Sequence, residues 1–235
     1  QLEEGNKCPH HHKPIPQKTE KGYFFKLSNF QDWLITFHNE NPDYIIPSSS
    51  RKEILSRIND EIRDLSISRP NQGWGIEVPG NPDFVIYTWF DALINYYSAL
   101  SQDQMSLWPA DCHVIGKDIA WFHCVIWPAI LKAADIKTPK QVYVHGMILA
   151  EDGKKMSKSL GNGVDPLEII SKFGLESFRY YLLKAIPSHS DGRFSEEGLI
   201  KENNASLAND YGNLLMRAVK LTMKRVGPQF KYSKE

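Results

Sequence analysis

Short apolar segments that alternate with helical patterns constrain this chain more than any other feature. Three buried-strand candidates, separated by helical patterns, lie at Phe84–Trp89, His113–Ile115 and Gln141–His145. The alternation predicts an α/β fold built on a parallel, doubly wound sheet. Ligands bind beyond the carboxyl ends of the strands in such sheets, so we expect functional residues to follow directly after each strand.

Helix start and stop signals surround these strands. Ser28 with Gln31 fits a capping box at the start of a helix, and Asn41–Pro42 is expected to end it. A second pattern predicts one helix over residues 119–134, with a kink at Pro128.

The carboxyl-terminal part has a different pattern. Asp165 and Pro166 fit the cap and the first turn of a helix. Residues 195–225 are expected to be mostly helical, as the start of an all-helical unit. The apolar positions expected to be buried there are Leu199, Leu207, Leu214, Leu215, Ala218 and Val219.

Composition narrows the functional classes. The 28 Lys and Arg residues balance the 28 Asp and Glu residues, which argues against a generic basic nucleic-acid binder, although a local patch could still contact RNA. The longest apolar stretch, residues 119–131, is too short to span a bilayer, so no membrane partner is expected.

Cysteine usage indicates the compartment. The three cysteines are odd in number and sparse, which favours a reducing environment over a disulfide scaffold. The first residues do not resemble a signal or transit peptide. A cytoplasmic location is expected, with an organellar matrix as the alternative, and two of the cysteines are expected to be buried thiols, Cys112 and Cys124.

The segment Gly153–Asn162 carries the clearest chemical signal. Small and conformationally permissive residues are interspersed there with lysines. Such a loop bends close to a polyanion and offers it ammonium groups and backbone N–H donors, which stabilise triphosphate charge without covalent chemistry. From composition alone, the alternative is a solvated basic turn in a hairpin.

The spelling of this loop is specific. Lys155-Met-Ser-Lys-Ser159 matches the KMSKS signature of class I aminoacyl-tRNA synthetases letter for letter. Further segments, in consistent order over nearly the whole chain, resemble methionyl-tRNA synthetases of the bacterial and organellar type; they are 64–70, 74–76, 87–96, 116–123 and 144–147. The resemblance implies the second half of a Rossmann-like doubly wound sheet, followed by the start of an all-α anticodon-binding bundle.

The resemblance also implies an activity, ATP-dependent methionine–tRNA ligation. The methionine carboxylate attacks the α-phosphate of ATP (with Mg²⁺), and the methionyl group then passes from the adenylate to tRNA(Met). Binding and electrostatics supply the catalysis, since no enzyme nucleophile is needed. The alternatives are another class I synthetase of the same subclass, against which Trp89, Tyr96 and His123 argue, and a non-catalytic synthetase-derived RNA-binding module.

On the nucleotide side, the resemblance implies that Lys158 contacts the phosphates in the transition state, with Lys155 as a weaker catalytic candidate. Asp118 would accept hydrogen bonds from the ribose hydroxyls, and Gly116 would allow the nucleotide to come close to the backbone. The alternative role for Asp118 is a helix cap. His145 is expected near the adenine. The other ATP-binding candidates in the signature are Met156, Ser157 and Ser159.

The methionine pocket implied by the resemblance consists of Trp89, Ala92, Leu93, Tyr96, Ile119 and His123. Trp89 and Tyr96 would close over the thioether, since sulfur–aromatic contacts are favourable by about 0.3–1.5 kcal/mol. Ile119 and His123 are four residues apart and so share one helical face. Some family members have Pro in place of Leu93, which affects pocket shape. The alternative for Trp89 and Ile119 is plain core.

Three further sites follow from the resemblance. Arg69 is expected at the mouth of the active site, or else in a structural ion pair. Asn213 and Arg217 lie on one helical face and would read anticodon bases, the alternative being an ordinary polar face. Cys8 and His11 have the spacing of half a zinc site, with His10 and His12 leaving the histidine ligand open.

The resemblance divides the chain into four segments. They are the end of a connective insertion with half a zinc knuckle (1–68), the second catalytic half with the KMSKS loop (69–164), a stem-contact segment (165–194) and the first anticodon helix (195–235). The HIGH signature of class I enzymes does not occur in this sequence. We therefore expect the N-terminal half of the enzyme to be a partner, without which this chain does not activate methionine.

Overall fold

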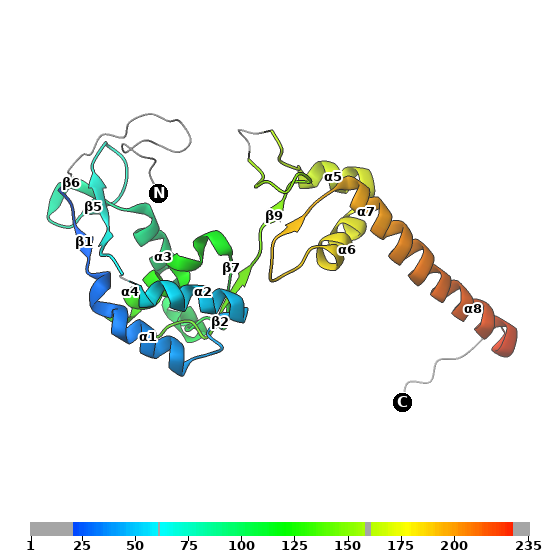
Figure 1. The fold of residues 1–235 in the computed structure, drawn as a ribbon, viewed down its shortest axis with the longest axis horizontal. Helices are drawn as coiled ribbons and strands as arrows, with labels where there is room; N and C mark the ends of the chain where they lie inside the picture. Colours follow the sequence, from blue (N-terminus) through cyan, green and yellow to red (C-terminus); the bar gives the residue numbers. More distant parts are fainter. Residues whose placement is uncertain (1–20, 61, 158–160, 228–235) are drawn as a thin grey trace. The chain divides into compact units, whose positions relative to one another are not determined.

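The computed structural model describes residues 21–60, 62–157 and 161–227 (Figure 1). The chain forms two compact units. The first unit comprises the described parts of 1–42, 52–110 and 121–139, and the second those of 43–51, 111–120 and 140–235. The division into four segments stays a prediction.

The first helices use their polar residues differently from the expected capping box. A 3-10 turn, Leu27–Phe30, precedes α1, Gln31–Glu40, and the next helix is α2, Ser48–Asn59. The Ser28 hydroxyl donates to Asp64 at 2.6 Å, and the Gln31 amide donates to two backbone carbonyls near the end of α2. The capping-box prediction was wrong because tertiary hydrogen bonds recruit both side chains. The expected stop is confirmed, with Asn41 as the C-cap of α1.

The strands of the first unit form small antiparallel sheets. β1 (Phe24–Phe25) pairs with β3 (Leu65–Ser66), while β4 (Ser68–Pro70), β6 (Asn81–Ile86) and β5 (Glu77–Val78) form a second sheet in that order. The predicted strand at residues 84–89 is therefore wrong in its partner. The turn at Gly80 (φ +77°) folds β6 straight back onto β5, whereas a parallel partner needs a long crossover.

Helix α3, Thr88–Ser98, begins inside the segment that we expected to be extended, and a 3-10 turn, Gln102–Leu107, follows it. The predicted helix over 119–134 is broken into a 3-10 turn (Lys117–Ile119), a π-helical turn (Phe122–Ile126) and α4 (Trp127–Ala133). We call Phe122–Ile126 the π turn. The largest fully buried side chains of the first unit include Leu34, Leu93, Val125, Trp127 and Leu131.

The second unit contains the expected parallel sheet. Its strands are β2 (Ile45–Ile46), β8 (Val142–His145) and β7 (His113–Gly116), in the order β2-β8-β7 with both pairs parallel. Two of the three predicted strands are thereby confirmed as parallel neighbours. β9 (Ile148–Leu149) continues from β8 and pairs in parallel with β10 (Gly192–Arg193).

Helices complete the second unit (Figure 1): α5 (Pro166–Phe173), α6 (Leu175–Ala185), α7 (Glu196–Glu202), a π-helical stretch (Asn203–Tyr211) and α8 (Gly212–Val226). The predicted cap is confirmed, because the Asp165 carboxylate accepts from the Leu167 N–H at 2.8 Å. A small core unites four buried residues of this region, Ile169, Tyr181, Phe194 and Leu199.

The predicted burial along the last helix was mostly wrong. Leu199 is buried and Leu207 half-buried, but Leu214, Leu215, Ala218 and Val219 are exposed. Burial needs a facing surface, and the described residues supply none along this part of α8. Among the described residues, no helix is both long enough and apolar enough to cross a membrane.

Candidate active site

An aromatic pocket in the first unit lies between α3 and the π turn. The Trp89 and Phe122 rings stack with centroids 4.4 Å apart and planes inclined by 21°. Two turns further along α3, the Tyr96 hydroxyl lies 2.8 Å from His123 Nε2. Helical spacing explains the arrangement, since residues 89 and 96 lie seven positions apart and therefore on one face of α3. Two aromatic rings and a polar end thus line the same side.

Burial fixes the polar end of this pocket. His123 is only 1% exposed, and its ring meets the Tyr96 ring edge to face at 5.6 Å. Desolvation raises the pKa of Tyr96 above its ordinary value, so its hydroxyl stays protonated at neutral pH. The Tyr96 hydroxyl therefore presents a neutral hydrogen-bonding group beside apolar surface, which suits an uncharged side chain with a weakly polar atom.

The remaining residues predicted for the pocket differ in their exposure and in the unit to which they belong. Leu93 is buried at 1% exposure, whereas Ala92 is exposed. Ile119 belongs to the second unit, so its place in the pocket stays a prediction. Sequence reasoning missed Phe122, although its position directly before His123 was an available signal.

The predicted nucleotide residues meet at the ends of two parallel strands in the second unit. Gly116 and His145 are register partners at the carboxyl ends of β7 and β8. A Cβ at Gly116 would lie 2.9 Å from Asp118 Oδ1, so a larger residue would shift the Asp118 carboxylate, while His145 Cε1 at 3.6 Å would be in ordinary contact. Lys155 Nζ lies 3.2 Å from Asp118 Oδ2. Glycine, carboxylate, imidazole and ammonium groups therefore form one cluster.

The lysine loop is a closed hairpin. Leu149 and Lys155 form an antiparallel bridge, and Gly153 at φ +79° makes the turn between them. Asn162 closes the loop, since its Oδ1 accepts from the Ser157 N–H at 2.8 Å and its amide donates to the Lys155 carbonyl at 3.3 Å. We assigned no role to Asn162 from sequence. Met156 and Ser157 are half-buried, while Lys158 and Ser159 lie outside the described residues.

Asp191 was also missed by sequence reasoning. It pairs with Lys117, beside Gly116, and its Oδ1 accepts from the Met147 N–H at 2.8 Å. The hydrogen bond from Lys117, followed by that from Met147, holds the pKa of Asp191 below its ordinary value. Asp191 thereby ties the segment before β10 to the residues that follow β7 and β8.

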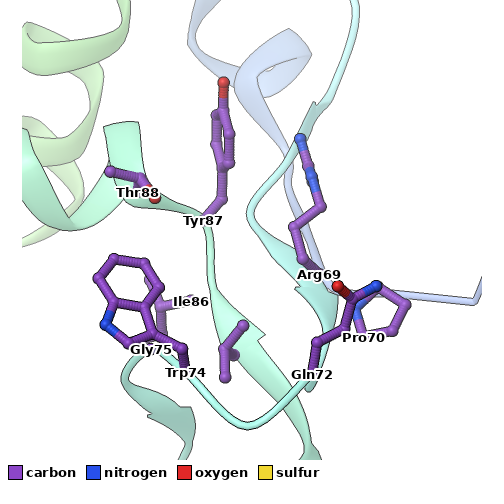
Figure 2. Close-up of a pocket in the computed structure, with 9 residues that line it drawn as sticks. Arg69, Pro70, Gln72, Trp74, Gly75, Ile86, Tyr87 and Thr88 are labelled. Carbon is purple, nitrogen blue, oxygen red and sulfur yellow. The ribbon is translucent and has the colours of Figure 1, made fainter.

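Arg69 belongs to a second pocket of the first unit. Its guanidinium lies 4.1 Å from the Tyr87 ring centroid and donates to the Ser68 carbonyl at 2.7 Å. Figure 2 shows the Arg69 and Tyr87 side chains extending in the same direction beside a cavity of about 590 Å³ that Trp74 also lines. Within the described part of the chain, Arg69 is held by this cation–π contact and by hydrogen bonds, with no ion pair, and its place at the mouth of the active site stays a prediction.

The predicted zinc ligands and the predicted anticodon residues lie in different parts of the chain. Cys8 and His11 lie outside the described residues, and among those described no group of three or more His, Cys, Asp or Glu side chains is arranged to hold a metal ion. The zinc ligands therefore stay a prediction. Asn213 and Arg217 are exposed one turn apart on α8. The two other cysteines differ, since Cys124 is buried as expected and Cys112 is exposed, contrary to our prediction.

Comparisons with known proteins agree with this geometry. The chain is 46% identical over 230 residues to the methionine–tRNA ligase of Caldanaerobacter subterraneus subsp. tengcongensis, an alignment that covers 95% of this chain and 36% of that enzyme. It is 44% identical over 227 residues to the Bacillus subtilis methionine–tRNA ligase, covering 94% of this chain and 34% of that one.

A solved structure shows the same fold. The Mycobacterium tuberculosis methionyl-tRNA synthetase bound by methionyl-adenylate matches with a TM-score of 0.84 and 38% identity, over 97% of this chain and 46% of that one. This chain thus spans less than half the length of these relatives. The family model of tRNA synthetases class I (M) matches residues 2–219. The chain therefore belongs to the class I tRNA synthetases, in the methionyl-tRNA synthetase family.

Proposed function

We propose that the full-length protein is a methionine–tRNA ligase that activates methionine with ATP and transfers it to tRNA(Met). The observation that carries the proposal is that one chain of this family holds both an aromatic pocket with a neutral polar end and a cluster of nucleotide-binding character. The first suits a thioether side chain, and the second suits the ribose and phosphates of ATP.

Methionine recognition is proposed for the aromatic pocket. Trp89, stacked on Phe122, offers a ring face of fixed orientation, and sulfur–aromatic contacts are worth about 0.3–1.5 kcal/mol. The neutral Tyr96 hydroxyl, which is hydrogen-bonded to His123, supplies a weak polar contact for the substrate side chain. A branched aliphatic side chain would forgo the sulfur contacts, which is the basis for discrimination.

Nucleotide binding is proposed for the cluster at the ends of β7 and β8. The missing side chain of Gly116 leaves room for the nucleotide backbone, and Asp118 would accept from ribose hydroxyls. Asp118 is paired with Lys155 through an exposed contact, which is weak and easily exchanged for a ligand. Lys155 is then free to turn toward the phosphates, together with Lys158.

Catalysis in this proposal is electrostatic. The methionine carboxylate forms a bond to the α-phosphorus while the bond to pyrophosphate breaks, and negative charge accumulates on the leaving group. Lysine ammonium groups of this loop stabilise that charge once Lys155 has exchanged Asp118 for the phosphates. We also propose that Asn213 and Arg217 bind anticodon bases and that Cys8 and His11 bind zinc. Mg²⁺ is proposed to accompany ATP, and the enzyme is proposed to be cytoplasmic.

The test is methionine-dependent exchange of pyrophosphate into ATP by the full-length protein. We expect exchange with methionine and little with leucine, isoleucine, valine or cysteine, followed by charging of tRNA(Met) but not of other tRNAs. Exchange that depends on one of the other amino acids would transfer the proposal to that synthetase. Absence of exchange with every amino acid, together with RNA binding, would replace it by a non-catalytic module.

A further inference from the structure

A proline interrupts the helical run that carries His123. Pro128 has no backbone N–H, so the carbonyl four residues earlier, that of Cys124, cannot receive its α-helical hydrogen bond. The chain adapts with the π turn directly before this point, where the Trp127 N–H donates to the Phe122 carbonyl five residues back. The Cys124 carbonyl therefore loses its α-helical donor and is open to a donor from elsewhere in the chain.

His38 is positioned to supply that donor. Its Nε2 lies 2.9 Å from the Cys124 carbonyl oxygen, from a helix that is 86 residues away in sequence. A carbonyl only accepts hydrogen bonds, so Nε2 carries the proton and donates. His38 and Cys124 are both 0% exposed, which leaves little room for water to replace the imidazole. An acceptor buried without a donor is costly, and the imidazole removes that cost.

The bond acts one residue away from the pocket. Cys124 follows His123 directly, so a bond that holds the Cys124 carbonyl restrains the backbone from which the His123 side chain extends. His123 in turn lies 2.8 Å from the Tyr96 hydroxyl, at the polar end of the aromatic pocket. A shift in the π turn would move both His123 and Phe122, the ring that stacks on Trp89.

We infer that His38 is a positioning residue for methionine recognition: it replaces the N–H that Pro128 lacks and thereby holds the π turn with His123 in register. The inference rests on the proposed function, since it names what the pocket is held in place for. His38 is needed only while residue 128 lacks a backbone N–H. A residue that acted only by packing would be needed whether or not residue 128 is proline.

The experiment is a double-mutant cycle in the full-length protein, with His38→Leu, Pro128→Ala and the two combined. Pro128→Ala provides the missing backbone N–H. His38→Leu should raise the KM for methionine about tenfold, since an orphaned buried acceptor is worth about that factor, while the KM for ATP changes by less than about twofold. Pro128→Ala alone should stay near wild type, and the double variant should recover most of the methionine KM.

A second variant covers a possible loss of folding. His38→Gln retains an N–H donor of similar reach, so its methionine KM should stay within about threefold of wild type even if His38→Leu does not fold. A loss in His38→Leu that Pro128→Ala does not reduce would overturn the inference, because packing would then explain it. So would a Gln variant that is as impaired as the Leu variant.

Thermal unfolding of the same four proteins keeps this test separate from the proposed function. The shifts in Tm for positions 38 and 128 should be strongly non-additive, with the combined variant more stable than His38→Leu alone. Additive shifts would contradict the hydrogen-bond role whether or not the protein is active. A wild-type protein without methionine-dependent exchange would refute the proposed function while leaving the coupling between His38 and Pro128 measurable.

Discussion

The aromatic pocket of the first unit and the lysine cluster of the second unit differ in how they are held. The pocket is packed, since His123 is 1% exposed and Trp89 stacks on Phe122. The cluster is exposed to solvent, since the paired side chains of Lys155 and Asp118 are 65% and 49% exposed. The same chain therefore uses two strategies for its two proposed ligands.

The difference follows from the physics of the two interactions. Selecting an uncharged side chain depends on shape and dispersion, which require a rigid, desolvated wall. Binding a polyanion depends on charge, and an exposed ion pair is worth at most about 1 kcal/mol, so its partners exchange readily. We expect substitutions in the pocket to change methionine affinity, and substitutions in the cluster to change nucleotide affinity or rate.

The two cysteines give the largest expected contrast between a buried and an exposed position. Cys124 lies in the π turn, where burial raises the pKa of its thiol to about 12, while Cys112 is exposed. A maleimide or aromatic disulfide reagent at pH 8 should label Cys112 at least about a thousandfold faster, because the thiolate is the reactive form. Peptide mass spectrometry reads each site, and both should react in urea. Comparable rates without urea would mean that the pocket wall is not closed.

Loss of the second signature lysine should have the next largest effect. Lys158→Ala in the full-length enzyme should lower the rate of methionine activation by about 100-fold or more, with little change in the KM for methionine, because the charge it neutralises develops in the transition state. Lys140→Ala, which removes an exposed lysine paired with Asp111, is the matched control and should leave the rate unchanged. Equal losses in the activation rate and in methionine affinity would contradict separate roles for the lysine cluster and the aromatic pocket.

Removal of the Tyr96 hydroxyl should have a moderate effect of the opposite kind. Tyr96→Phe deletes the 2.8 Å hydrogen bond to His123, so the KM for methionine should rise about fivefold while kcat and the KM for ATP stay nearly constant. Tyr97→Phe is the matched control, since that ring packs edge-on against Trp108 instead. A lower kcat with unchanged KM would show that the pair acts in the chemical step rather than in recognition.

Asp191 should produce the smallest effect, confined to one pH range. Its hydrogen bonds hold its pKa below the ordinary value, so the stabilisation is present above the pKa of the unfolded carboxyl and is lost as the pH falls through the folded value. Asp191→Asn should lower Tm by about 1 °C above roughly pH 5, and the difference should shrink below about pH 4. Asp111→Asn, at a still more exposed pair, should change Tm less. A difference that grows on acidification would contradict this assignment.

Local signals in the sequence predicted part of the fold and part of the candidate site. Asp165 caps its helix, β7 and β8 are parallel neighbours, and Gly116, Asp118, His145 and Lys155 cluster at the strand ends, as strand order alone suggests. The roles of these residues toward ATP stay predictions. The pairing of strands and of polar side chains was predicted less well. β6 joins an antiparallel sheet, and the Ser28 hydroxyl donates to Asp64 instead of capping a helix.

The sequence by itself determined the family, the lysine signature and the alternation of strands and helices, because these depend on residue identity and on short-range periodicity. Only the tertiary structure decided that Phe122 stacks on Trp89, that Asp191 joins the strand ends and that His38 serves the carbonyl left by Pro128. Such contacts join residues far apart in sequence, where many partners are chemically equivalent. The selected partner is the one that fits the packing and hydrogen bonding of the whole fold together.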